Sequence, residues 1–382
     1  MVTIFPWRGR TNKKAFLERF RAALLQQFPD AVIEESGELE LRVVHSPQGQ
    51  TRIVWLERAY EEFCKTPAEA DAIIARFLRS VVASGSDTLD VDRIIPVIKD
   101  HAWLESQRTG LDAEAEFNPW TEPYNSELVV VFAEYQDGLR FSGRVDFESC
   151  GIALEELRER AFANLRRVTQ DFTVRGAEGE YIVGAGGTID SSLLLLDEVT
   201  QDPRIQLAGT ALVGVSDRDS FWVADDANPY AVFGIAAKVA GYYRSEPYPI
   251  SPHLFHKQGE RWMPLDSEPV DEGHPIPNLN VIDIVGKKRD GGVDLVVIIA
   301  SPLSADARSI LRLSRKLDGY LQEINSDSWR QESPGATAQS TRIIVKAHPD
   351  SDPVIPQLLS AYGSWVKSRG AVLVIEELEM DG

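Results

Sequence analysis

Cysteine is scarce in this chain, and its scarcity excludes two kinds of protein. Cys64 and Cys150 are the only two among 382 residues, too few for a disulfide framework or for a zinc site built from cysteine. The simplest interpretation is two reduced, partly buried thiols in a cytosolic protein. A catalytic cysteine with a distant histidine stays open, because one sequence does not show which residues meet in space.

Long hydrophobic runs are also missing. No apolar stretch approaches the roughly 18–20 residues that cross a bilayer. Met1–Trp7 is short and apolar, but four basic residues follow it between positions 8 and 14. This order and length differ from those of a secretory signal. We therefore expect a cytoplasmic protein that does not bind a membrane.

Basic residues are outnumbered in the sequence. The 40 Lys and Arg residues face 59 Asp and Glu residues, which gives a net charge of −19 at pH 7. Binding to a nucleic-acid backbone needs clustered Lys and Arg, so we expect no nucleic-acid partner. The acidity is compatible with a basic protein partner, or with solubility alone.

The rest of the composition is that of an ordinary globular protein, with 43% hydrophobic and 26% charged residues. The length suggests two or three domains, and the patterns predict the α+β class. We expect four parts: a helix–hairpin–helix subdomain (residues 1–86), an α+β core with antiparallel hairpins (87–265), an acidic, proline-rich linker (266–278) and a C-terminal αβ domain of order ββαβαβ (279–382).

Several segments of the first two thirds resemble a known family of uncharacterised proteins. They are Ile94–Lys99, Leu128–Tyr135, Ser191–Glu198 and Ala211–Val215 with the turn after it. With the order of elements, they make residues 1 to about 278 similar to the YtpQ-like family. The resemblance implies a mixed α/β region with antiparallel hairpins, and it brings no activity, cofactor or site residue. The tail more weakly resembles another group of small uncharacterised domains.

A glycine-rich stretch, Val183–Thr188, lies between a predicted strand and a predicted helix. Such a turn can hold a phosphate at a helix N-terminus. A P-loop would also need a lysine at its end, and a dinucleotide fold would need a third glycine where Ile189 and Asp190 stand. We expect a tight turn followed by a helix that Asp190 or Ser191 caps, and we expect no cofactor.

Two histidines, His253 and His256, lie three residues apart. On a helix they would share a face and could bind a metal. Pro249 and Pro252 indicate extended chain instead, where residues three apart point to opposite faces. We therefore expect no metal site. Paired carboxylates occur at many places and most are interpreted as solvated surface.

The segment His101–Ser126 has no recognisable period and carries several aromatic side chains. A stretch of about 25 residues without secondary structure is unusual in a compact domain unless it has a function. Trp103, Trp120 and Tyr124 are the candidate binding residues, because aromatic rings on a polar loop are common interface anchors. The alternative is that these rings fold back on the core as a lid.

The sequence offers no recognisable catalytic motif, such as the Gly-x-Ser-x-Gly elbow of hydrolases. We therefore expect a non-catalytic intracellular protein that binds or regulates another protein. The alternative is a hydrolase whose site is assembled from scattered Asp, Glu and His residues. A pocket lined by convergent polar groups with shifted pKa values would favour the enzyme.

Overall fold

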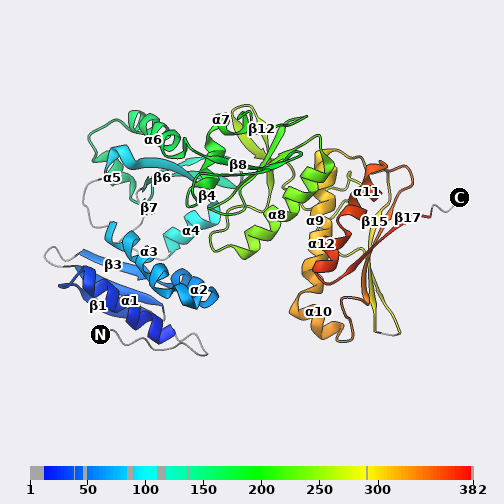
Figure 1. Ribbon diagram of the computed structural model, residues 1–382, viewed down its shortest axis with the longest axis horizontal. Coiled ribbons are helices and arrows are strands. Elements are labelled where there is room, and N and C mark those ends of the chain that lie inside the picture. The colour runs from blue at the N-terminus through cyan, green and yellow to red at the C-terminus, as the bar shows by residue number, and fades with distance from the viewer. Residues whose placement is uncertain are drawn as a thin grey trace. The chain divides into compact units, whose positions relative to one another are not determined.

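The computed structural model describes residues 13–37, 39–45, 50–83, 89–109, 118–135, 138–289 and 291–379. The chain divides into two compact units. Figure 1 shows its helices and strands, coloured along the chain. The first unit comprises Met1–Pro96, Leu111–Trp120 and Phe132–Leu165, and the second comprises Val97–Gly110, Thr121–Val131 and Arg166–Gly382. Helices occur together with antiparallel and mixed sheets, so the predicted α+β class is confirmed.

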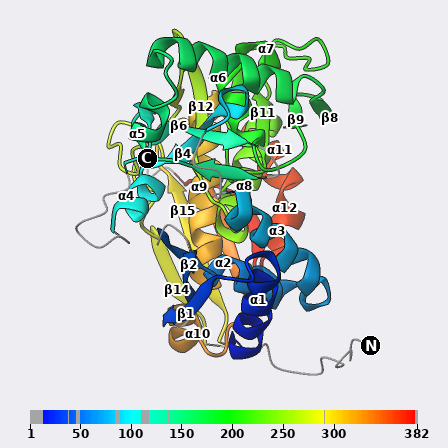
Figure 2. The same ribbon diagram turned by 90° about the vertical axis from the view of Figure 1, so that its left-hand side faces the viewer.

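The first unit starts with a small layer of helices on an antiparallel sheet (Figure 2). Its elements are α1 (Lys13–Gln27), β1 (Val32–Gly37), β2 (Glu40–His45), β3 (Gln50–Trp55), α2 (Glu57–Lys65), a 3-10 turn (Pro67–Glu69) and α3 (Ala70–Ala83). Phe16, Phe20 and Leu24 of α1 recur at helical spacing and are buried in the shared core. The helix–hairpin–helix expected from the sequence did not include β1 and α2, which the structure adds. The sequence of β1 does not alternate between apolar and polar residues, because Glu34 and Glu35 are consecutive, charged and exposed.

A second sheet follows the order β4-β6-β5, with β7 paired to β6. Its strands are β4 (Ile94–Asp100), β5 (Thr121–Pro123), β6 (Leu128–Tyr135) and β7 (Leu139–Phe141), and the nearby helices are a 3-10 turn (Val91–Arg93), α5 (Arg144–Glu148) and α6 (Leu154–Thr169). The apolar face of α6, with Leu157, Ala161 and Leu165, is fully buried. Asn164 on the same helix donates hydrogen bonds of 3.0 Å to the carbonyls of Val91 and Ile94.

The second unit contains a six-stranded antiparallel sheet of order β13-β12-β10-β11-β9-β8. The strands are β8 (Thr173–Ala177), β9 (Glu180–Gly184), β10 (Ala211–Gly214), β11 (Phe221–Asp225), β12 (Leu254–Gln258) and β13 (Arg261–Pro264), and the helices before and between them are α4 (His101–Thr109), a 3-10 turn (Asp190–Leu195), α7 (Asp197–Thr200) and α8 (Pro229–Ser245). The single helix expected after the glycine-rich turn is therefore wrong, because a 3-10 turn and the short helix α7 take its place. Ile189 occupies the N-cap position of the 3-10 turn and makes no side-chain cap.

Helix α8 packs on one face of this six-stranded sheet. Asn228 caps it by accepting hydrogen bonds from the backbone N–H groups of Tyr230 and Ala231, and Pro229 takes the first helical position. An added Cβ at Gly214 of β10 would lie 2.5 Å from Val239 of α8. Only glycine lets the helix and the strand approach this closely.

The strands of the last hundred residues follow the predicted order ββαβαβ, but an additional short helix follows the first helix and two short helices stand in place of the second. The strands form the sheet β14-β15-β16-β17, in which β14 pairs antiparallel and the other strands are parallel. Figure 1 shows α9, α11 and α12 on one face of this sheet. The bounds are β14 (Ile284–Lys287), β15 (Val293–Ile299), α9 (Ala307–Ile324), α10 (Asp327–Glu332), β16 (Thr341–Ala347), α11 (Val354–Ala361), α12 (Gly363–Ser368) and β17 (Val372–Glu377).

Residues 266–278, expected to be a linker, are instead packed against helix α9. Asp266 and Ile276 are 5% and 1% exposed. One hydrophobic core runs from α8 into the sheet β14–β17, and the second unit includes all of residues 166–382. The segment therefore has contacts that a free linker lacks. The acidic and proline-rich composition did not reveal these contacts, because their partners lie on a helix some 40 residues later in the chain.

Candidate functional site

Trp120, one of the three candidate binding residues, lies in the core of the first unit. Its side chain is 4% exposed. The ring stacks on Phe132 with centroids 3.8 Å apart, and Phe147 meets its edge at 5.3 Å. The burial agrees with the alternative of a ring folded back on the core. A binding anchor needs an exposed ring surface, and the buried ring of Trp120 has almost none.

Tyr124 and Trp103 lie in the second unit. Tyr124 is 9% exposed, and its hydroxyl accepts a hydrogen bond of 3.3 Å from the backbone N–H of Trp262. Burial raises the pKa of the Tyr124 hydroxyl to about 12. Trp103 is half-buried on α4, and Lys99 Nζ lies 5.6 Å from its ring centroid. The expected aperiodic loop is partly regular, since α4 and β5 occupy it. Its acidic positions 112, 114 and 116 lie outside the described residues.

A hollow lies beside the glycine-rich turn, over the β8–β9 hairpin. It has a volume of about 530 Å³. Its wall consists of Asp171, Thr173, Arg175, Ile182, Val183, Gly184, Ala185, Gly186, Gly187 and Asp190. Gly186 and Gly187 have φ of 104° and 85°, a region that favours glycine, and a Cβ on either would meet open space. On this side, the wall of the hollow therefore consists of the backbone of the two glycines, without side chains.

A second hollow of about 360 Å³ lies along the same hairpin and shares Arg175 and Ile182 with the first. Its other lining residues include Trp222 and Ile235, which provide an apolar floor. Arg175 pairs directly with Ile182, and Ile182 pairs with Trp222 across the next strand. Residues directly opposite one another share a face of the sheet. We call the two adjoining hollows the β8 groove.

Asp190 is the buried charge of the β8 groove. The residue is 5% exposed, and its Oδ1 accepts hydrogen bonds from the backbone N–H groups of Ala185 (2.8 Å) and Gly187 (3.1 Å). Burial raises the pKa of the Asp190 carboxyl to about 6; the two N–H bonds oppose this, and nearby Asp219 and Asp217 add to it. Two backbone donors of the turn, which could have held a phosphate, are therefore already bound to a carboxylate of the protein.

A buried polar cluster surrounds Asp217, whose charge acts on Asp190. Asp217 accepts hydrogen bonds from the hydroxyls of Ser216 (2.7 Å) and Ser220 (2.5 Å) and from the backbone N–H of Asp219. Trp222 Nε1 donates to Ser216 Oγ at 3.2 Å. Because Asp217 is 4% exposed and fully bonded, it acts on the β8 groove only through its charge.

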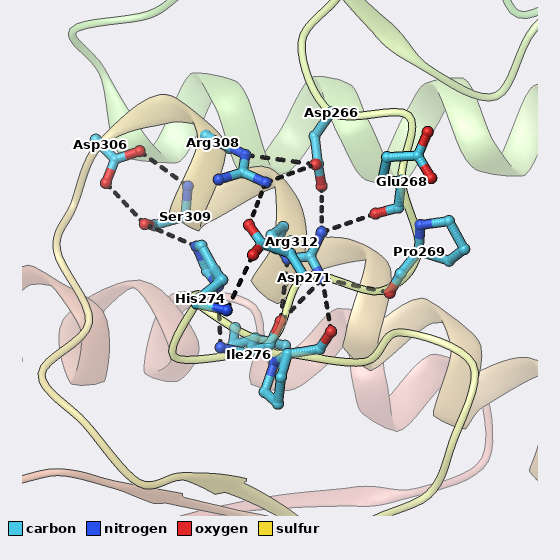
Figure 3. A network of polar contacts seen from close by, with 12 residues as sticks. Asp266, Glu268, Pro269, Asp271, His274, Ile276, Asp306, Arg308, Ser309 and Arg312 are labelled. Carbon is cyan, nitrogen blue, oxygen red and sulfur yellow. Dashed lines mark hydrogen bonds and ion pairs between the residues drawn. The ribbon is translucent and has the colours of Figure 1, made fainter.

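A larger network surrounds Arg312 on α9 (Figure 3). The side chain of Arg312 is fully buried, and its guanidinium pairs with Asp266 at 2.7 Å. It also donates to the backbone carbonyls of Glu268, Pro269, Ile276 and Pro277. A buried arginine is tolerated only when its charge and its N–H groups are met. This network fixes residues 266–278 on α9.

The same network contains a His–Ser–Asp set, and its hydrogen bonds run in the wrong direction for a nucleophile. His274 Nδ1 accepts from the backbone N–H of Ile276 at 2.9 Å, so the ring donates through Nε2 to Ser309 Oγ at 3.2 Å. Ser309 in turn donates to Asp306 at 2.7 Å. Burial and then Arg312 lower the pKa of His274. A catalytic serine would donate to the histidine, so this set is interpreted as the N-terminal cap of α9.

A second set, Ser251, Glu127 and His253, places the carboxylate in the middle. Ser251 Oγ donates to Glu127 Oε2 at 2.8 Å, and His253 Nδ1 lies 2.7 Å from Glu127 Oε1. A triad needs the histidine between the other two residues. His253 therefore has a carboxylate partner, Glu127, but the two residues are too far apart in the sequence for a short motif to predict the contact. Within the described ranges, no group of three or more metal-binding side chains occurs.

Comparison with known proteins identifies no relative. No family model, no curated protein and no solved structure matches the chain. Within the part of the chain that the structure describes, no helix is long and apolar enough to cross a membrane.

Sequence reasoning missed the β8 groove because it missed strand β8. Arg175 and Thr173 were not assigned to any element, and Asp190 was expected only as a helix cap. The available signal was the pair Glu178-Gly179, which turns with φ of 54° and 82°. Two residues with positive φ form the hairpin turn that Asp-Gly and Asn-Gly usually make. The mutual placement of Asp190, Asp217 and Arg175 had no local signal.

Proposed function

We propose that this chain is a non-catalytic, intracellular protein-binding protein whose partner lays an extended segment along the β8 groove. The observation that carries the proposal is the pair of adjoining hollows on an edge strand. Strand β8 ends the sheet order, and its residues are mostly exposed. Exposed edge strands bind extended peptides by adding a strand, while adjoining pockets select alternate side chains.

The charge of the groove supports a basic partner segment. Four acidic residues line the two hollows, Asp171, Glu178, Glu180 and Asp190, against the basic Arg175 and Lys238. Lys238 is paired with Glu180. The chain as a whole carries −19, so a basic segment would be steered toward it by the long-range field as well.

We also propose membership of the YtpQ-like family for residues 1 to about 278. The support is the set of apolar motifs described above. Three of them coincide with β4, β6 and β10, which belong to the four-stranded sheet of β4–β7 and to the six-stranded sheet.

A blocked groove tests the proposed function. Thr173 is exposed on β8 and lines the hollow, so Thr173→Trp should fill it without changing the core. Gln258→Trp is the matched control, since it places the same side chain at an exposed strand position outside the groove. In quantitative affinity capture from a lysate of the source organism, we expect T173W to lose proteins that the wild type and Q258W retain. Identical captured sets for all three proteins contradict the proposal.

The second candidate is a hydrolase, and the Asp190 carboxyl is the observation that favours it. A buried acid with a pKa near 6 at the edge of a hollow suits general acid–base catalysis. The test is hydrolysis of p-nitrophenyl esters, phosphates and glycosides by the wild type and by Asp190→Asn. Turnover that is lost in D190N and in T173W would favour the enzyme over the binding protein.

A further inference from the structure

We infer that the hollow beside the glycine-rich turn is a subsite for one cationic side chain, lysine or arginine, of the bound segment. This inference rests on the proposed function, because it names what the β8 groove selects. It is carried by the placement of one buried carboxylate in the wall of a hollow that is otherwise backbone and small side chains.

The geometry leaves one carboxylate oxygen of Asp190 for a ligand. Both backbone donors of the turn bond to Oδ1, and among the described residues no hydrogen bond reaches Oδ2. Oδ2 lies close to the backbone of Gly184, 3.1 Å from where a Cβ would be. A carboxylate can accept about four hydrogen bonds, so the ammonium of a lysine or the guanidinium of an arginine can bond to it.

The surrounding charges favour a cation over an anion. Asp217 and Asp219 both act on Asp190 from the loop after β10, and Asp171 stands in the wall of the hollow. Among the described residues of this wall, Arg175 on β8 is the one basic side chain, and it is exposed. Asp219 is paired with Arg218, so an arriving cation meets the buried negative charge of Asp190 with Asp217 and Asp171 nearby. The opposing charge of Arg175 is screened by solvent.

The subsite makes binding depend on pH. Because burial holds the pKa of the free Asp190 near 6, the carboxyl is charged at pH 7.5 and neutral at pH 4.5. A cationic side chain binds the charged form, so the preference for lysine or arginine should weaken as the pH falls through 6. The charged groups around Asp190 are Asp217, Asp219 with its partner Arg218, Asp171 and Arg175.

The test is selection from a phage-displayed library of random heptapeptides on the intact protein at pH 7.5. We expect peptides that share a lysine or arginine at one position. The best peptide and its form with norleucine at that position are then titrated against three proteins: wild type, D190N and T173W. With the wild type, norleucine should weaken binding by about tenfold or more, which is the value of a charge-assisted hydrogen bond. With D190N the two peptides should bind equally.

The possible results separate the two proposals. If no peptide is selected, or if the selected peptides bind T173W as tightly as the wild type, the proposals of peptide binding in the β8 groove and of a cation subsite are both overturned. If peptides bind the groove but show no preference for a basic residue, the groove stands and the cation subsite is overturned. The same holds if D190N keeps the preference, because the cation is then recognised elsewhere.

Discussion

Replacing Asp190 by asparagine should make this protein more stable at neutral pH. The carboxylate is 5% exposed, and burial raises its pKa from 3.8 to about 6. One pKa unit corresponds to 1.36 kcal/mol, so keeping Asp190 charged in the folded state costs about 3 kcal/mol at pH 7.5. Asparagine retains an oxygen for the N–H groups of Ala185 and Gly187 and carries no charge to bury. We expect D190N to gain 1 kcal/mol or more, up to about that cost.

The pH dependence gives the sign of the effect. A carboxyl whose pKa is raised on folding holds its proton in the folded state between about pH 4 and pH 6, while the unfolded chain releases it. The wild type should therefore gain stability as the pH falls through this window, and D190N should not. Below about pH 4 both states of the wild type are protonated, and the advantage of D190N disappears.

Urea unfolding followed by tryptophan fluorescence at pH 7.5, 6, 5 and 4 measures this difference. Asp30→Asn is the control, because Asp30 is an exposed carboxylate outside the groove. We expect D30N to follow the wild type at every pH. A D190N protein that is less stable than the wild type at pH 7.5, or a difference that does not change with pH, would falsify the account of a buried, charge-destabilised carboxylate.

Three further predictions concern the core. Asp266→Ala should cost about 3–5 kcal/mol in urea unfolding, because it leaves the fully buried charge of Arg312 without its partner; a cost below 1 kcal/mol would contradict the role of the pair. Residues 279–382 expressed alone should show no cooperative thermal transition, because Arg312 would lose all its acceptors. A sharp melt would instead support the interpretation of residues 266–278 as a linker between two domains. Trp120→Ala should cost about 3–5 kcal/mol because its ring is stacked on Phe132; weakened partner capture at unchanged stability would support the interface instead.

The parts of the fold that the sequence predicts well are those with a strong local pattern. In the helix α6, the hairpin β10–β11 and the helix α8 after Pro229, the periodicity, the turn residues and a cap all favour the observed element. The strands β1 and β8 were missed because charged or small residues break their alternation. Their pairing is set by neighbouring strands, which no short window of sequence contains.

The site was less predictable than the fold, for a physical reason. Trp120 and Tyr124 looked like interface anchors because aromatic rings in a polar segment suggest exposure, but both are buried against residues distant in the chain. Asp266 and Arg312 are 46 positions apart, and the tertiary fold of the residues between them brings the two side chains together. A buried pair of this kind leaves no mark in composition or spacing.

The choice of aspartate over asparagine at position 190 is the remaining question about the groove. The turn itself needs only an oxygen that accepts from Ala185 and Gly187, and asparagine would provide it without burying a charge. A purely structural role therefore leaves the charge, and its cost in stability, without a cause. A cationic ligand would supply one, because the desolvated carboxylate binds a cation more strongly than an exposed one. The two measurements on D190N thus bear on one argument: higher stability together with lost preference for a basic side chain assigns the charge to binding, whereas higher stability with unchanged binding leaves it unexplained.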